Sequence, residues 1–184
     1  MNRVIYSSNT VLVSTAPAAA SHTGLFDLKL IDRVQTAQAS FTTQVKRFKQ
    51  IGFDGFLLDN FYAPPKISFD LTYYNSDTSN EAALGLNVNG ECLFKNQAVT
   101  GKDINIFLLS DAVGGKDFSS LTNFTGSNVF GIGNALITSY SISAGLGNMP
   151  TTQLSFEANN IVFDTFTGNN SVPDLTYSGK KTFH

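Results

Sequence analysis

Apolar and polar side chains alternate over long stretches of the chain, which is the pattern of half-buried β-strands. The clearest run is residues 66–75, where Ile67, Phe69, Leu71 and Tyr73 fall on one face and Ser68, Asp70, Thr72 and Tyr74 fall on the other. Pro64 and Pro65 come directly before it, and proline is tolerated where a strand begins. The pattern therefore predicts a long strand that starts after the two prolines.

The same alternation predicts three more long strands, at residues 32–45, 134–144 and 151–163. The segment 145–150 between the last two contains Gly, Asn and Pro, which predicts a hairpin. Shorter strands are expected at residues 3–6, 10–14, 104–109 and 129–132.

Helical signals are few. Thr78-Ser79-Asn80-Glu81 has the sequence of a capping box and precedes an Ala- and Leu-rich stretch, which predicts one short helix; the alternative is a polar loop with a helical turn. A second short helix is expected at residues 116–123. Residues 45–63 are interpreted as a long loop, and residues 164–184, rich in Asn, Thr, Gly and Ser, as an extended arm.

Together these elements predict a mostly β protein: a β-sandwich or barrel with one short flanking helix, a long loop and extended terminal arms. The expected organisation is a single β domain with an N-terminal extension at residues 1–163, followed by a C-terminal arm at 164–184. The chain has 184 residues, which fits one domain of ordinary size.

The composition changes the picture mainly through charge. Charged residues make up 14% of the chain, against about 25% in typical globular proteins. The net charge is −2, so there is no basic surplus to neutralise phosphates, and tight nucleic-acid binding is not expected. The N-terminus lacks a signal-peptide pattern and no apolar run is long enough to span a bilayer. We expect a soluble protein, made in the cytoplasm, without a membrane partner.

No constellation of residues points to catalysis, a cofactor or a metal. The two histidines, His22 and His184, are not in any metal-ligand spacing, and no strained Gly-x-Ser-x-Gly turn is present. Cys92 is the only cysteine and is interpreted as a half-buried packing residue. The dispersed acidic residues leave paired-carboxylate hydrolysis as an open alternative. We expect no enzymatic activity, no cofactor and no metal.

The polar faces of the four long strands carry a shared signal. They are rich in Ser, Thr, Gln and Asn. Taking every second residue within 36–44, 68–72, 139–143 and 153–159, none is Lys or Arg. Solvated faces ordinarily mix both charge signs, and edge strands are often protected by lysine. One interpretation of this pattern is an ordinary solvated sheet face. The other is a surface that does not bind a polyanion.

These same segments resemble subunits of the phage tail tube. The similarity is carried by residues 33–41, by residues 63–74 with Asn80-Glu81 and Leu84-Gly85 after them, and by the final hairpin at 133–157. It touches most of residues 32–163, and tail hub or neck proteins could share it. The resemblance implies hexameric rings that stack, with the long strands joined across subunits into an inner barrel around a channel for DNA.

The resemblance, together with the charge pattern, assigns roles to particular residues. Expected to face the lumen are Thr36, Gln38, Ser40, Ser68, Asp70, Ser139, Ser141, Ser155 and Glu157. Expected at contacts between subunits are Phe48, Ile51, Phe53, Phe56, Leu57 and Phe61, although the same residues could instead cap the subunit's own core. The implied partners are copies of the chain itself, sheath or terminator and hub proteins, and DNA in transit without tight binding. The implied location is the virion tail, after assembly in the host cytoplasm.

The main rival is a glycan-binding or adhesin β-sandwich module. Neutral polar faces and six tyrosines favour it, because aromatic rings stack on sugars. The absence of Trp, and of a visible cluster of aromatic and acidic residues at one loop end, speaks against it.

Overall fold

The computed structural model describes residues 9–15, 28–49, 56–90, 92–94, 104–111, 126–158 and 160–165, with the backbone alone at 44–49, 56–65 and 111. These residues form eight strands and one helix in the order β1 Asn9–Ser14, β2 Lys29–Ile31, β3 Val34–Lys49, β4 Phe56–Tyr74, α1 Ser79–Ala83, β5 Ile104–Asp111, β6 Ser127–Ser143, β7 Thr151–Ala158 and β8 Asn160–Thr165. The expectation of a mostly β fold with one short helix is confirmed.

All strands belong to one antiparallel sheet with the order β2-β1-β5-β6-β7-β4-β3, and β8 pairs with β6 beside this path. The path ends at β2 and at β3, so the described strands make an open sheet that is not closed into a barrel.

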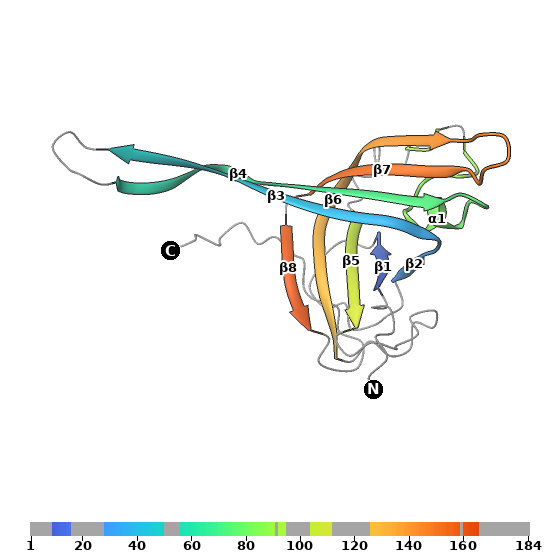
Figure 1. The fold of residues 1–184 in the computed structure, drawn as a ribbon, viewed down its shortest axis with the longest axis horizontal. Coiled ribbons are helices and arrows are strands. Elements are labelled where there is room, and N and C mark those ends of the chain that lie inside the picture. The colour runs from blue at the N-terminus through green and yellow to red at the C-terminus, as the bar shows by residue number, and fades with distance from the viewer. Residues whose placement is uncertain are drawn as a thin grey trace.

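Strand β6 divides the sheet into two halves. Its residues 127–135 pair with β5 and, in part, with β8, whereas residues 136–143 pair with β7. Near the change of partner, Asn134 has a φ of 55°, and the register with β7 shifts between Ile137 and Ser139. We call β3, β4, β7 and residues 136–143 the hairpin half, and β1, β2, β5, β8 and residues 127–135 the base half. Figure 1 shows the two crossing at a steep angle.

The main core lies between the two halves. Ile67, Phe69, Leu71 and Tyr73 of β4 and Leu154 and Phe156 of β7 are buried, as are Val11, Val13, Ile106 and Ile132 of the base half. The expected apolar face of β4 is therefore confirmed. Each large side chain buried this way contributes about 1.5–3 kcal/mol relative to an exposed one.

The base half is apolar on both faces. A second cluster on its other side contains Leu12, Leu28, Phe107, Leu109 and Val129. This explains why β1 and β5 have continuous apolar runs in sequence, whereas β4 and β7 alternate.

The interpretation of residues 45–63 as a long loop is wrong where the structure describes them. β3 continues to Lys49 and β4 already begins at Phe56, and the two strands pair as far as Lys49 and Phe56. Pro64 and Pro65 do not mark a strand start; they lie inside β4 next to a register shift between Thr42 and Gln44 of β3. A bulge of this kind tolerates the missing N–H of proline.

Other strand boundaries also differ from expectation. The predicted strands 129–132 and 134–144 are one strand, β6. The predicted strand 151–163 is two, because β7 pairs with the second part of β6 and β8 with the first. Strand β8 ends at Thr165, beyond the expected strand end at 163. The short strand expected at 3–6, the helix at 116–123 and the arm beyond 165 lie outside the described residues.

The predicted helix is present, but it is not held by a capping box. Thr78 makes no side-chain cap. Instead Oδ1 of Asp77 accepts a 2.9 Å hydrogen bond from the backbone N–H of Ser79 and another from the Ser79 hydroxyl. Asn80 exchanges two hydrogen bonds of 2.9 Å with the backbone of Asp32, which fixes α1 to the corner between β2 and β3.

Candidate functional site

The polar side chains of the hairpin half form one continuous face across four strands. We define the polar face as the following residues: Thr36, Gln38, Ser40 and Thr42 of β3; Lys66, Ser68, Asp70 and Thr72 of β4; Gln153, Ser155 and Glu157 of β7; and Ser139, Ser141 and Ser143 of β6. Strand pairing sets them in rows: Gln38 is opposite Asp70, Asp70 opposite Ser155, and Ser155 opposite Ser139. All nine residues expected at a lumen therefore share one face.

Neighbouring strands of this face are joined by side-chain hydrogen bonds. The hydroxyls of Ser40 and Ser68 lie 2.6 Å apart, and the Ser155 hydroxyl donates to Oδ1 of Asp70 at 2.7 Å. Thr138 donates to the carbonyl of Ser155 at 3.1 Å. These contacts fix the positions of hydroxyls on a surface whose described side chains are mostly uncharged, and among them the Ser155–Asp70 contact joins a hydroxyl to a carboxylate.

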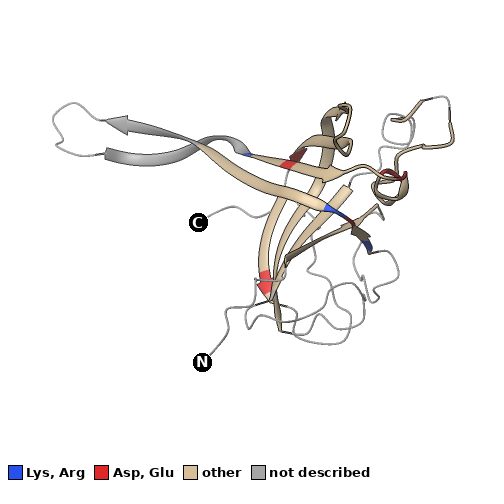
Figure 2. Ribbon diagram, turned by 45° about the vertical axis from the view of Figure 1, so that its right-hand side comes forward, with Lys and Arg blue, Asp and Glu red and all other residues tan. Residues whose placement is uncertain are grey.

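The sequence pattern missed one charged member of the face. Lys66 follows the same alternation as Ser68, and its Nζ lies 2.6 Å from Oε1 of Glu157. Both side chains are exposed, at 66% and 51%. Figure 2 shows how sparse other charges are on the described strands of the hairpin half.

Arg33 lies at the corner that precedes β3, where its φ is 58°. Its guanidinium forms a 3.0 Å ion pair with Oδ2 of Asp77 and a 3.4 Å hydrogen bond to the carbonyl of Tyr74. Hydrogen bonds from the side chain and backbone of Ser79, with a smaller effect of Arg33, lower the pKa of Asp77 well below its ordinary value. The side chains of Lys46, Arg47 and Lys49 lie outside the described residues.

A buried polar cluster lies behind the polar face. Oε1 of Glu81 accepts hydrogen bonds from the hydroxyls of Tyr73, at 2.8 Å, and Tyr140, at 3.3 Å. Asn75 donates to the same oxygen at 3.5 Å and to Thr152 at 3.2 Å. Burial, followed by the effect of Glu81, raises the pKa of both tyrosines. The cluster joins α1 to β4, β6 and β7.

The candidate contact residues fall in and around the β3–β4 hairpin. Phe48 is in β3, and Phe56, Leu57 and Phe61 are in β4; their backbones are described and their side chains are not. Ile51 and Phe53 lie outside the described residues.

Sequence reasoning passed over a different exposed apolar site, the turn between β6 and β7. Leu146 is fully exposed there, and Met149 is 57% exposed. Two unpaired large apolar side chains after an alternating strand are the signal that was available in the sequence.

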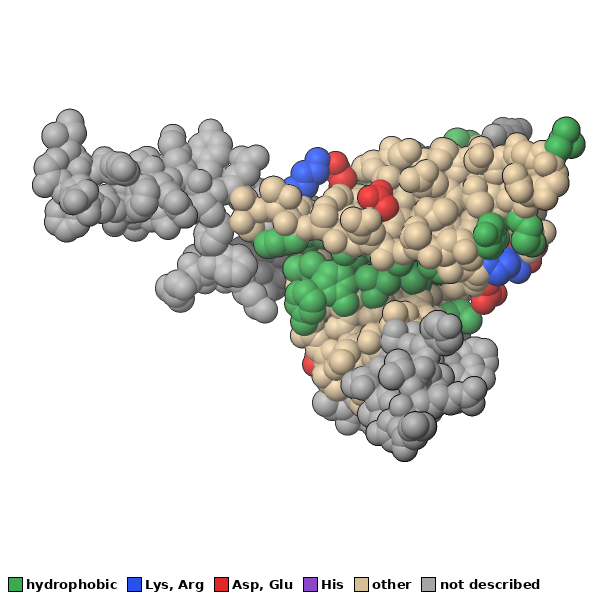
Figure 3. All heavy atoms as spheres, in the orientation of Figure 1, with side chains coloured by type: hydrophobic (Ala, Val, Ile, Leu, Met, Phe, Trp, Pro, Cys, Tyr) green, Lys and Arg blue, Asp and Glu red, His purple; other side chains and the backbone are tan. Residues whose placement is uncertain are grey.

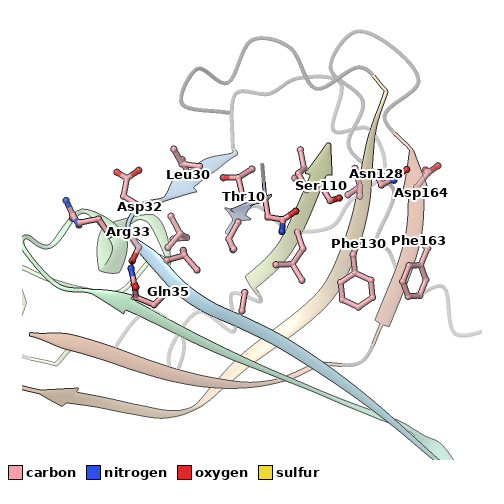
Figure 4. A pocket seen from close by; sticks show the side chains of 18 of the residues that line it. Thr10, Leu30, Asp32, Arg33, Gln35, Ser110, Asn128, Phe130, Phe163 and Asp164 are labelled. Atoms are coloured by element: carbon pink, nitrogen blue, oxygen red, sulfur yellow. Dashed lines mark hydrogen bonds between the residues drawn. The ribbon is translucent and has the colours of Figure 1, made fainter. Parts of the chain in front are cut away.

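A groove lies between the base half and the start of β3. It has a volume of about 1160 Å³ and is lined by residues of β1, β2, β3, β5, β6 and β8. The rings of Phe130 and Phe163 lie side by side in it, 4.7 Å apart, with Gln35 across the groove and Asp164 at one rim (Figure 4). Figure 3 shows apolar side chains gathered in the angle between the two halves.

Three further observations concern Cys92, metal binding and membrane spans. Cys92 is exposed, which corrects its interpretation as a half-buried packing residue. Among the described side chains, no three His, Cys, Asp or Glu residues are grouped closely enough to hold a metal ion. No helix in the described ranges is both long and apolar enough to cross a membrane.

Comparison with known proteins gives a match at the level of the fold. No family model and no curated protein matches the chain. A subunit of the SPP1 tail tube superposes with a TM-score of 0.56 and 15% identity over 88% of this chain and 78% of that one. A chain of the anti-feeding prophage tube-terminating cap gives 0.50 and 9%, over 84% and 87% of the two chains. A chain of the anti-feeding prophage baseplate gives 0.50 and 12%, over 90% and 98%. The chain has the fold of phage tail tube proteins.

Proposed function

We propose that the chain is a non-enzymatic structural subunit of a phage tail tube, which assembles into hexameric rings that stack around a channel for DNA. The observation that carries the proposal is the polar face, which continues across all four strands of the hairpin half and ends at two edges that are open among the described strands. A face of this kind lines a channel once copies of the sheet are joined edge to edge.

The directions of the strands suit such joining. The four strands of the hairpin half are antiparallel in the order β6-β7-β4-β3, so the first and the last run in opposite directions. When β3 of one copy lies beside residues 136–143 of the next, the new pair is antiparallel as well. A ring of copies then becomes one continuous barrel, and closure removes the exposed edges.

The chemistry of the polar face suits the passage of DNA. Its described side chains are mainly hydroxyls and amides, with Asp70 and with Lys66 paired to Glu157. Because each phosphate neutralised by a free cation strengthens binding, a wall without free cations lets DNA move without being held. This is why we place Thr36, Gln38, Ser40, Ser68, Asp70, Ser139, Ser141, Ser155 and Glu157 at the lumen.

The fold supports the same setting. The matched structures are parts of a tail tube, a tube-terminating cap and a baseplate, and the baseplate structure is six-fold symmetrised. We therefore infer that the partners are copies of the chain and neighbouring tail components such as sheath, terminator and hub proteins. The location follows as the virion tail, with assembly in the host cytoplasm. A hub or neck subunit with the same fold is the nearest alternative.

Disulfide cross-linking tests the ring. In a Cys92→Ser background, Ser141→Cys on β6 is combined in turn with Thr36→Cys, Gln38→Cys or Ser40→Cys on β3. Directly opposed residues on paired strands have Cβ atoms about 4.5–5.5 Å apart, and the closest of these pairs, the non-hydrogen-bonded ones, approach the roughly 3.5–4.5 Å that a disulfide needs. Oxidised assemblies are expected to give a ladder of covalent oligomers that ends at the hexamer.

The matched control combines Ser141→Cys with Ser68→Cys, because Ser68 lies on the inner strand β4 and not at an edge. That pair is expected to give no ladder. The proposed ring would be contradicted by a protein that remains monomeric at high concentration. It would also be contradicted by a ladder of oligomers from the control pair alone.

Sugar binding in the groove is a second candidate function. The paired rings of Phe130 and Phe163 form an aromatic surface that the sequence did not reveal. Phe163 is 76% exposed and offers a free ring face. A glycan array decides: specific binding by the monomer, lost in Phe163→Ala, favours this function over the tube.

A further inference from the structure

We propose that Glu157 neutralises Lys66 so that the polar face shows no free cation to a polyanion that passes over it. The inference rests on the proposed function, because it concerns what the face does when it lines a channel. Lys66 is the one cation among the described side chains of the face, and it is held 2.6 Å from Glu157.

The strand register makes Glu157 the acid within reach of Lys66. Ser68 is directly opposite Glu157 on the neighbouring strand, so Lys66 is its diagonal neighbour on the same face. On the other side, Lys66 is opposite Thr42, which carries no charge. The second acid of the face, Asp70, is four residues further along β4, about 13 Å away at the rise of a strand, and accepts a hydrogen bond from Ser155.

Stability does not explain the pair. Both side chains are more than half exposed, and an ion pair in that setting contributes little to the stability of the fold. The pair does change the electrostatic attraction that a nearby phosphate experiences. The Debye length at physiological salt is about 8 Å, and the two opposite charges lie much closer together than that, so their fields largely cancel. A phosphate therefore meets a neutral pair when Glu157 is present and a full positive charge when it is removed.

Ring symmetry multiplies the effect. Each subunit that loses Glu157 adds one free cation at the same height of the channel, so the variant wall carries a belt of positive charge. Every phosphate neutralised by such a belt makes the slope of log affinity against log salt more negative by about 0.9. The wild-type belt contains only neutral pairs.

The test uses assembled tubes of four proteins: wild type, Glu157→Gln, Lys66→Gln/Glu157→Gln, and Asp164→Asn. Tubes are mixed with a short fluorescent DNA duplex and pelleted at a series of salt concentrations, and the retained DNA is measured. Asp164→Asn is the matched control, because it removes one exposed carboxylate from β8 of the base half and changes the net charge equally.

Glu157→Gln is expected to retain DNA more strongly than wild type at low salt, on the order of tenfold or more, with a steeper salt dependence. The double variant and Asp164→Asn are expected to match wild type. Equal gains in Glu157→Gln and Asp164→Asn would show a general charge effect and overturn the inference. So would unchanged retention in Glu157→Gln tubes whose polar face is shown by electron microscopy to line the channel. A polar face on the outside of the tubes, or no tubes from wild type, would instead overturn the proposed function together with the inference.

Discussion

The hydroxyl of Tyr73 donates a 2.8 Å hydrogen bond to Oε1 of Glu81, and this contact ties α1 to the end of β4 inside the core. Tyr73 is fully buried and Glu81 is 3% exposed. The second oxygen of Glu81, Oε2, has no hydrogen-bond partner among the described residues. The helix is five residues long, so its position depends on this buried contact and on the Asn80–Asp32 pair rather than on its own stability.

Replacing Tyr73 with Phe is expected to lower the free energy of unfolding by about 1.5–3 kcal/mol, because a hydrogen bond to a charged group is lost in the core. Urea denaturation measures the change. Tyr74→Phe is the control, because Tyr74 lies on the opposite face of the same strand; a change within about 0.5 kcal/mol is expected there. Equal effects of the two substitutions would contradict the role given to the Tyr73 hydroxyl.

Stability is also expected to fall at high pH. Burial and the neighbouring Glu81 raise the pKa of Tyr73 and Tyr140 above the ordinary value of 10.0, so the folded protein keeps these protons where the unfolded chain releases them. The stabilisation is complete below pH 10.0 and is lost as the pH rises above it. Urea midpoints between pH 8 and 11 measure the fall, which should be shallower in Tyr73→Phe. A parallel fall in both proteins would argue against Tyr73 as a source.

Gly85 is expected to resist substitution. It ends α1 with a φ of +75°, and an added Cβ would lie 2.9 Å from Cγ2 of Thr15. Gly85→Ala is therefore expected to cost about 1–2 kcal/mol for the left-handed backbone alone, with the contact in addition. Gly145→Ala is the matched control, because its nearest neighbour would be 3.7 Å away and its φ is not positive. Thermal unfolding of the two variants compares them directly.

The β3–β4 hairpin gives a prediction about assembly. Phe56→Ser combined with Leu57→Ser is expected to leave a folded subunit, because the backbones of β3 and β4 pair with each other as far as Lys49 and Phe56. The variant is expected not to stack, because the two apolar side chains are expected at contacts between subunits. Circular dichroism reports folding, and negative-stain microscopy counts tubes against single rings. An unfolded variant would show that these side chains belong to the subunit's own core.

Alternation was a reliable guide wherever one face of a strand is buried and the other is polar. Residues 66–74 and 151–158 were placed correctly, including which side chains are inside, because neighbours on both sides keep the two-residue period intact. Lys66 is nevertheless missing from the predicted polar face, since the strand is expected to begin directly after the prolines, which makes Lys66 its first residue.

The signal failed where the period shifts. The register of β3 with β4 shifts between Thr42 and Gln44 and again between Gln44 and Val45. Such shifts interrupt a two-residue period, so residues 45–63 show no alternation in sequence although their described part is paired in the sheet. The prediction that Glu81 belongs to a capping box is wrong for another reason. Its spacing from Thr78 fits a capping box, but two tyrosine hydroxyls from distant strands bind its carboxylate in the core. A local sequence pattern cannot show that side chains from distant strands bind the carboxylate of Glu81.

Strand β6 runs without interruption through both halves of the sheet, from Ser127 to Ser143. The base half needs its first part as the partner of β5 and β8, and the hairpin half needs its second part as the partner of β7. Neither half is complete while the other is missing, so the two are expected to melt together in a single all-or-none transition. A fragment that contains only one half is expected to be unable to fold by itself.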